Sequence, residues 1–247
     1  MRGGFKMILT PIELLQAHLY LFSTYELPTT RFITRFLQKD SIVVDIGANI
    51  GYVTMFCAKI LENSGAVYAF EPQAENYKLL QQHIELNNFQ NIVPQKFAVT
   101  STPTTLRLYL ATDNHGAHST IFNADVMTEN YEEVQGLTLD SFVEEKRFSK
   151  LDLVKIDVEG AEFEVLQGMQ NVMRSFRPVI IVELNEMLQQ QRGMSSNSIK
   201  SMLIEYGYTI FSPTEQGFLQ NTASTPFENS ICVPNEKITQ LNNLLKK

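Results

Sequence analysis

The chain contains the stretch Ile42-Val43-Val44-Asp45-Ile46-Gly47-Ala48-Asn49-Ile50-Gly51, and its organisation can be worked out from there. Three β-branched apolar residues in a row indicate a strand buried on both faces, as in a parallel sheet. Asp45 ends the apolar run, and a turn with Gly47 and Gly51 leads into residues 52–61, which have helical length and apolar content. Such a turn predicts a site for a nucleotide-like ligand, because glycine admits the ligand and the first helical turn offers free N–H groups.

The segments that follow alternate between strand and helix. Residues 66–70 predict a second strand, residues 74–86 a helix and residues 92–99 a third strand. The alternation resumes later, with predicted strands at 152–157, 178–184, 208–211 and 230–234 and predicted helices at 140–148, 161–173 and 198–206. Because crossovers between parallel strands are right-handed, this order predicts an α/β fold with a doubly wound, Rossmann-like parallel sheet.

Two segments lie outside this alternation. Residues 1–40 predict a helical extension, with helices at 11–22 and 29–38, which forms either a lid or oligomer contact or a cover over a sheet edge. Residues 100–140 predict a β-rich insertion, which is too short for a core of its own. We therefore expect one main domain over residues 41–247 that carries the insertion.

Composition excludes several classes of protein. The 247 residues carry a net charge of −7 and no basic run, which argues against a nucleic-acid partner. Cys57 and Cys232 are too few for a disulfide scaffold or a metal knuckle. Polar residues interrupt the apolar segment from Met7 to Phe22, so no membrane span is expected and a cytoplasmic location is predicted.

The residues of the turn narrow the choice of ligand. The dinucleotide fingerprint G-x-G-x-x-G needs a second glycine that admits the pyrophosphate, and Asn49 stands there instead. Asn49 would crowd a pyrophosphate but not a ligand with an amino-acid portion beside the turn. The negative charge of Asp45 suits a cationic group better than a phosphate.

Glu71 lies 20 residues beyond Gly51, where the second strand ends. A carboxylate there accepts two hydrogen bonds from ribose hydroxyls and repels a phosphorylated ribose. Adenosine that carries a charged amino acid describes S-adenosylmethionine. The alternative is that Glu71 is simply a solvated strand end.

The chain resembles the class I S-adenosylmethionine-dependent methyltransferases, and more narrowly the FkbM family, over roughly residues 40–235. The residues that carry the resemblance are Val44-Asp45-Ile46-Gly47-Ala48-Asn49-Ile50-Gly51-Tyr52, Phe70-Glu71-Pro72, Leu137-Thr138-Leu139-Asp140, Lys155-Ile156-Asp157-Val158-Glu159-Gly160-Ala161-Glu162 and Val165-Leu166-Gln167-Gly168. The resemblance implies a seven-stranded sheet with an antiparallel last strand. It also implies methyl transfer from S-adenosylmethionine to a hydroxyl of a sugar or natural product.

Carried over position by position, the resemblance assigns the cofactor contacts. Asp45, Gly47, Asn49 and Gly51 would line the methionine end, Glu71 would hold the ribose and Ala98 would lie near the adenine. The partner is then a small-molecule or glycan acceptor, whose identity the sequence leaves open, as it does the oligomeric state. A homo-oligomer is compatible with it.

Acidic residues follow two later strands and are the candidates for catalysis. Lys155, Asp157 and Glu159 share one face of a strand, and Asp157 and Glu183 end neighbouring strands at the edge where ligands bind. A sugar hydroxyl is a weak acid, so we expect Asp157 to act as a base or substrate anchor, assisted by Glu159 and Glu183. These acids also allow a divalent-metal site, but without a histidine ligand we predict no metal.

The remaining alternatives concern weaker signals. His115 and His118 occupy the polar loop of the insertion, where they contact the acceptor or are merely solvated. An NAD-linked oxidoreductase is disfavoured by the missing glycine. A non-catalytic binding module that keeps the cofactor fold is the other alternative.

Overall fold

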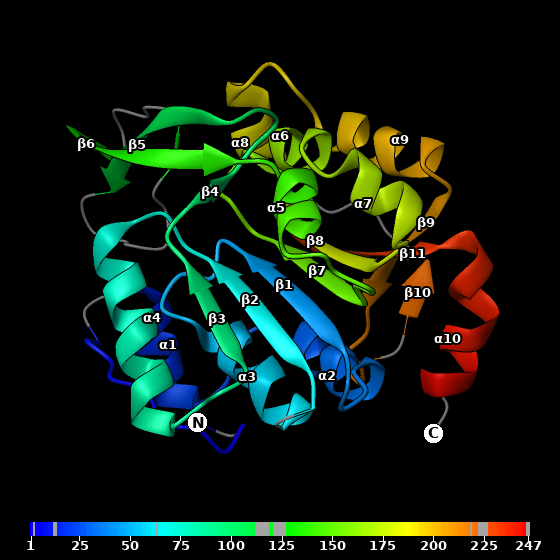
Figure 1. Cartoon of the computed structure of the whole chain (residues 1–247), viewed down its shortest axis with the longest axis horizontal. Coiled ribbons are helices and arrows are strands. Elements are labelled where there is room, and N and C mark those ends of the chain that lie inside the picture. The colour runs from blue at the N-terminus through cyan, green and yellow to red at the C-terminus, as the bar shows by residue number, and fades with distance from the viewer. Residues whose placement is uncertain are drawn as a thin grey trace.

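The computed structural model describes residues 1, 3–11, 14–62, 64–111, 119–120, 127–217, 219–221 and 227–245. Within these residues the main sheet has the strand order β10-β9-β11-β8-β7-β1-β2-β3 (Figure 1). Its strands are β1 (Ile42–Ile46), β2 (Ala66–Phe70), β3 (Ile92–Gln95), β7 (Leu153–Ile156), β8 (Val179–Asn185), β9 (Tyr208–Pro213), β10 (Leu219–Asn221) and β11 (Phe227–Pro234).

The direction of the strands matches the expected fold class. β1 pairs in parallel with β2 and β7, and β7 pairs in parallel with β8, whereas β11 runs antiparallel to both β8 and β9. The predicted seven-stranded, mostly parallel sheet with an antiparallel last strand is therefore confirmed. The short strand β10 adds one further antiparallel strand beside β9.

Helices cover both faces of this sheet. One face packs against α1 (Leu14–Phe22), α2 (Leu27–Phe36), α3 (Tyr52–Leu61), α4 (Ala74–Asn87) and α10 (Ile238–Leu245). The other packs against α5 (Leu139–Glu145), α6 (Glu162–Gln167), α7 (Gln170–Ser175) and α9 (Ser196–Glu205). Because successive side chains of a strand alternate, Val43 belongs to the first core and Val44 to the second. The apolar run that predicted a doubly buried strand fills both cores.

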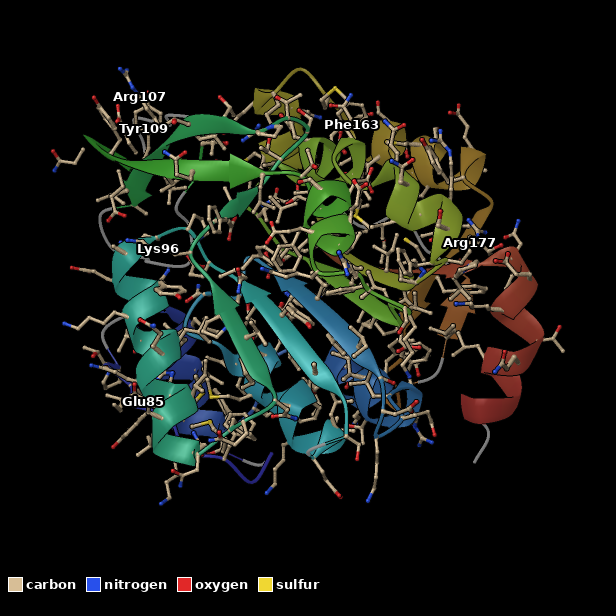
Figure 2. The ribbon with its side chains drawn as sticks, viewed as in Figure 1. Glu85, Lys96, Arg107, Tyr109, Phe163 and Arg177 are labelled. Carbon is tan, nitrogen blue, oxygen red and sulfur yellow. The ribbon has the colours of Figure 1, made fainter. Side chains whose placement is uncertain are left out.

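The insertion forms a second sheet above the carboxyl ends of β1, β2 and β3 (Figure 1). Its order is β4-β6-β5, with β4 (Ala98–Val99), β5 (Thr104–Ala111) and β6 (Met127–Leu137). Tyr109 faces Tyr131 on the outer side, near Arg107 (Figure 2), while Leu106 and Leu108 line the cavity described below. His115 and His118 lie outside the described residues.

Two predicted elements are wrong in extent, for non-local reasons. The strand predicted at 92–99 is split between β3 and β4, because β2 ends at Phe70 opposite Gln95 and offers no further partner. The helix predicted at 161–173 is divided into α6 and α7 at Gly168, where a Cβ atom would lie 2.0 Å from the carbonyl oxygen of Thr100. Helix α8 (Glu186–Gln191), capped by Asn185, was not predicted.

The N-terminal extension contains the two expected helices. α1 covers Leu14–Phe22 of the described residues, and α2 begins at Leu27, with Pro28 in its first turn, where a missing N–H costs nothing. Both helices pack on the same face as α3, and residues before and within them contribute to the first core. No helix among the described residues is both long and apolar enough to cross a membrane.

Candidate functional site

The turn between β1 and α3, residues 47–51, depends on left-handed backbone at three positions. Gly47, Asn49 and Gly51 have φ values of 80°, 51° and 92°. At Gly47 a Cβ atom would lie 1.7 Å from the carbonyl oxygen of Asp157, so only glycine lets the ends of β1 and β7 come this close. The N–H groups of Gly47 and Ala48 donate to the carbonyl oxygen of Phe70 at 3.0 and 2.9 Å, which ties the turn to the end of β2.

Beside this turn lies a cavity of about 440 Å³. Its walls include eight of the nine residues predicted for the site, namely Asp45, Gly47, Asn49, Glu71, Ala98, Asp157, Glu159 and Glu183. Gly51 is the exception. It starts α3 and packs against Leu80, whose Cδ1 atom would lie 2.5 Å from an added Cβ, so its role in the structure is to let α4 approach the turn.

Asp45 is buried at the base of the turn. Its Oδ2 atom accepts a hydrogen bond from the Thr54 hydroxyl at 2.5 Å, while Oδ1 has no donor among the described residues. Burial raises the pKa of this carboxyl above its usual range, against the opposing effect of Lys155. Asp45 therefore offers one open acceptor to a ligand in the cavity.

Glu71, which ends β2, is held by the backbone. Its two carboxyl oxygens accept hydrogen bonds from the N–H groups of Asn49 at 2.8 Å and Gln73 at 2.9 Å. Burial raises the pKa of Glu71 to about 7, although both hydrogen bonds favour the ionised form. Each oxygen keeps a second lone pair, so the fixed carboxyl can still accept from a ligand.

An acidic cluster of Glu26, Asp157 and Glu183 surrounds Lys155 on the face of the sheet that packs against α2. The Nζ atom of Lys155 lies 2.8 Å from Oδ2 of Asp157, and the lysine is buried. Asp45 is opposite Lys155 in the strand register, and Asp157 and Glu183 follow on the same side. One ammonium therefore serves several carboxyl groups.

Protons are unevenly distributed in this cluster. Burial disfavours the ionised form of Asp157, but Lys155 and a hydrogen bond with Glu183 outweigh it and keep the pKa of Asp157 below its usual range. The charge of Asp157, together with burial, raises the pKa of Glu183 to about 10, and burial raises the pKa of Glu26. Asp157 is thus the ionised member, and Glu183 holds the proton between them.

The same three carboxyl groups are the candidates for holding a metal ion. One oxygen each from Glu26, Asp157 and Glu183 lies within 4.8 Å of the other two. Oxygen ligands of this kind suit Mg²⁺ or Ca²⁺. However, the Lys155 ammonium already occupies a cation position beside Asp157, so the prediction of no metal ligand stands as a prediction.

Glu159 lies two residues beyond Asp157, in a turn with φ of 51°. Burial raises its pKa to about 8, and the negative charges of Asp157 and Glu162 act in the same direction. The carbonyl oxygen of Glu159 accepts a hydrogen bond from the hydroxyl of Ser119 at 3.0 Å. The insertion therefore contacts the turn that carries Glu159.

Several functional candidates were missed by sequence reasoning. Tyr25 and Glu26 reach the cavity from the start of α2, and Glu164, Arg192 and Thr120 line it from α6, the end of α8 and the insertion. Glu26 directly precedes α2, but nothing in the local pattern connects it with residues 157 and 183. Only tertiary packing brings these groups together.

The sheet order, the glycine turn and the acids at the ends of β1, β2, β7 and β8 define a protein of the Rossmann-like class with a ligand site at the carboxyl edge of its sheet. Residues 45–210 match the sequence model of the methyltransferase FkbM domain. The chain belongs to this family.

Named relatives agree with this assignment. The chain is 27% identical over 152 residues to the hexuronic acid methyltransferase AglP of Haloferax volcanii, a match that covers 61% of this chain and 59% of that protein's length. It is 26% identical over 196 residues to methyltransferase 1 of Beauveria bassiana, covering 66% and 78% of the two chains.

Solved structures show the same fold. The FkbM methyltransferase of Methylobacillus flagellatus KT has a TM-score of 0.51 at 16% identity, over 85% of this chain and 48% of that one. A methyltransferase of Streptococcus mutans, SMU.1697c, solved in complex with SAH, has a TM-score of 0.50 at 12% identity, over 92% and 99% of the two chains.

Proposed function

We propose that this protein transfers a methyl group from S-adenosylmethionine to a hydroxyl of a sugar or natural product. The observation that carries the proposal is the pairing of Asp45 and Glu71 around the glycine turn, in one cavity. Asp45 presents an open, buried acceptor, and Glu71 presents a carboxyl group fixed by two backbone N–H groups. These groups suit an ammonium and a ribose diol.

Carboxyl groups predominate among the polar side chains of the cavity. Seven of them line it, those of Glu26, Asp45, Glu71, Asp157, Glu159, Glu164 and Glu183, against the cations Lys155 and Arg192. Glu159 and Glu183 are mostly protonated at pH 7, but Asp157 is ionised and Asp45 keeps an acceptor oxygen without a donor, which suits a ligand with an ammonium group. Phe70, Phe97 and Ala98 line the wall below the insertion and would accept the adenine.

S-adenosylmethionine, when bound, supplies an activated methyl group, so the protein needs only to orient the acceptor and take its proton. We assign Glu159 as the general base that takes the proton of the acceptor hydroxyl, because its pKa of about 8 suits a base that works near neutral pH. Asp157, ionised and held by Lys155, is the weaker base and acts as the anchor for the acceptor hydroxyl. Glu183 keeps Asp157 in place through the shared proton.

The acceptor class rests on the relatives. The Haloferax volcanii protein is named for hexuronic acid, which supports a sugar acceptor for this chain. Because the match spans 59% of that protein, its full activity is not carried over. Both neutral and acidic sugars should therefore be tried as methyl acceptors.

Isothermal titration of the full chain with S-adenosylmethionine, its demethylated product and NAD tests the donor site. We expect the first two to bind and NAD not to bind, and Asp45→Asn and Glu71→Gln each to weaken binding about tenfold, the order expected for one lost charged hydrogen bond. Glu85→Gln, on the exposed face of α4 (Figure 2), is the control and should bind normally. Binding of NAD alone would favour an oxidoreductase and overturn the proposal.

Transfer of radiolabelled methyl groups to methyl glycosides of glucose, galactose, glucuronic acid and galacturonic acid, and to a polyol macrolide, tests the reaction. We expect at least one acceptor to gain an O-methyl group. Cofactor binding without transfer to any of these acceptors would favour the non-catalytic binding module.

A further inference from the structure

Arg192 and Glu164 form a second charged pair in the cavity, apart from the acidic cluster. Nη1 of Arg192 lies 2.6 Å from Oε1 of Glu164, and Nη2 donates to the hydroxyl of Thr120 in the insertion. The arginine side chain is 11% exposed and the glutamate side chain 32%, so the guanidinium is largely withdrawn from solvent and the carboxyl group only in part. Both residues line the cavity.

This pair is incomplete. Nε of Arg192 and Oε2 of Glu164 are buried and have no hydrogen-bond partner among the described residues. By contrast, Arg177 and Glu236 form a two-pronged pair, from Nε to Oε1 at 2.7 Å and from Nη2 to Oε2 at 3.0 Å. That second pair lies near α10, on the opposite side of the molecule from the insertion (Figure 2). In the Arg177–Glu236 pair the guanidinium and the carboxylate thus make two hydrogen bonds to each other, whereas the Arg192–Glu164 pair in the cavity leaves one donor and one acceptor without a partner.

A buried polar atom without a hydrogen-bond partner lowers the stability of the fold, and native proteins contain few such atoms. Eight such side-chain atoms occur among the described residues, and four belong to residues that line the cavity. Two of those four, on Asp45 and Glu26, lie on the side of the glycine turn and the acidic cluster. The other two are Nε of Arg192 and Oε2 of Glu164, one donor and one acceptor on paired side chains.

The pair lies on the acceptor side of the cavity. The glycine turn and Glu71 follow β1 and β2, whereas α6 and α8 follow β7 and β8, farther along the sheet. A Cβ atom at Gly160 would lie 3.5 Å from Nε of Arg192, so the guanidinium lies against the turn that also carries Glu159. A group bound there is a neighbour of the proposed base.

We propose that Arg192 and Glu164 form an acceptor subsite that holds a second hydroxyl of a sugar, beside the hydroxyl that is methylated. A hydroxyl both accepts and donates, so it can accept from Nε–H of Arg192 while it donates to Oε2 of Glu164. Arg192 is already neutralised by Glu164, so the pair offers an acceptor carboxylate no net attraction. The subsite rests on the proposed function and recognises a hydroxyl group, whether the sugar that carries it is neutral or acidic.

The test measures acceptor binding separately from donor binding. The full chain, loaded with S-adenosylhomocysteine, is titrated with methyl glucoside, methyl glucuronide and the 2-, 3-, 4- and 6-deoxy glucosides by ligand-observed NMR. Arg192→Lys keeps the positive charge toward Glu164 but removes Nε–H, and Glu164→Gln replaces the open acceptor by a donor. Arg177→Lys in the saturated pair is the matched control.

We expect Arg192→Lys and Glu164→Gln each to weaken binding of both glycosides about tenfold or more, the range for a hydrogen bond to a charged group. Affinity for S-adenosylhomocysteine and binding by Arg177→Lys should stay within about twofold, inside ordinary context variation. One deoxy glucoside should lose a similar factor with the wild-type protein and lose nothing further with Arg192→Lys. The loss of affinity of the deoxy glucoside for the wild-type protein tests the subsite without any substitution that could lower the stability of the fold.

Three results would overturn the subsite: unchanged glycoside affinity in both variants, loss confined to the glucuronide, or no glycoside bound by the loaded wild-type protein. Failure to bind S-adenosylhomocysteine at all would instead overturn the proposed function.

Discussion

The Nζ atom of Lys155 lies 2.8 Å from Oδ2 of Asp157, and this contact sets the charge state of the acids around it. Asp157 stays ionised because of the lysine, and Glu183 in turn stays protonated because of Asp157. Glu26, from the N-terminal extension, completes the group. Lys155 is thus the counter-ion of the whole cluster and not of Asp157 alone.

Removing that counter-ion should destabilise the fold. Lys155→Met leaves Asp157 buried without a cation, and breaking a buried pair from one side typically costs about 3–5 kcal/mol. Thermal unfolding should show a clear fall in Tm. Lys150→Met, which breaks the solvent-exposed contact with Asp40, serves as the control and should change Tm little. Equal Tm shifts in the two variants would contradict this account.

Methyl transfer should depend on the ionisation of Glu159. Its raised pKa, about 8, means that the carboxylate able to take a proton is the minority form at pH 7 and grows as pH rises. We expect kcat to increase through pH 8 and then level off, and Glu159→Gln to lower it 10²-fold or more, about the contribution of a general base. A pH profile that is flat in both proteins would exclude Glu159 as the base.

Cofactor binding should follow the ionisation of Glu71. In the folded protein Glu71 has a pKa of about 7, above its usual 4.5, so its neutral form favours folding and that contribution is lost as pH rises through 7. The ribose hydroxyls donate to the ionised form. Affinity for S-adenosylhomocysteine, measured by calorimetry from pH 5.5 to 8.5, should therefore rise up to about pH 7 and then stay constant. Glu71→Gln should remove this dependence on pH.

Methyl transfer should not require a divalent cation. Lys155 already supplies the positive charge beside Asp157, so chelation with EDTA should leave the initial rate unchanged. The measurement compares chelated protein before and after Mg²⁺ or Mn²⁺ is added back. A rate that collapses and is restored by the metal would make Glu26, Asp157 and Glu183 its ligands.

The glycine turn should tolerate no side chain at position 47. Gly47→Ala puts a Cβ atom against the Asp157 carbonyl, at 1.7 Å, and forces β1 and β7 apart. We expect loss of cofactor binding together with a lower Tm. Gly193→Ala is the matched control, because Gly193 also has positive φ, 69°, but has no heavy atom within 4 Å of an added Cβ. Normal cofactor binding by Gly47→Ala would contradict the role given to this turn.

The elements that local pattern determines were predicted well. Residues 52–61 and 66–70 form α3 and β2 with the expected bounds, because apolar periodicity and the flanking turns decide both. The split of residues 92–99 depends on where the neighbouring strand ends, and the break at Gly168 depends on Thr100, which is far away in the sequence. Neither the split of residues 92–99 nor the break at Gly168 can therefore be predicted from the local sequence pattern.

The candidate site divides in the same way. Asp45, Glu71, Asp157 and Glu183 were found because each ends a strand at one edge of the sheet. Glu26 and Arg192 were missed because each follows no strand and reaches the cavity only through the packing of helices. Sequence motifs identify site residues at the ends of strands. They do not identify site residues that reach the cavity through the packing of helices.

The close approach of Gly47 to the Asp157 carbonyl has an evolutionary consequence. The turn proposed to hold the donor and the strand end that carries the proposed catalytic acids are in direct backbone contact, so neither can shift without the other. Thr120 of the insertion and Arg192 at the end of α8, by contrast, are joined to each other by a hydrogen bond between their side chains. Homologous proteins can therefore acquire a different acceptor through changes in the insertion and at the end of α8, while the contact between Gly47 and Asp157 is kept.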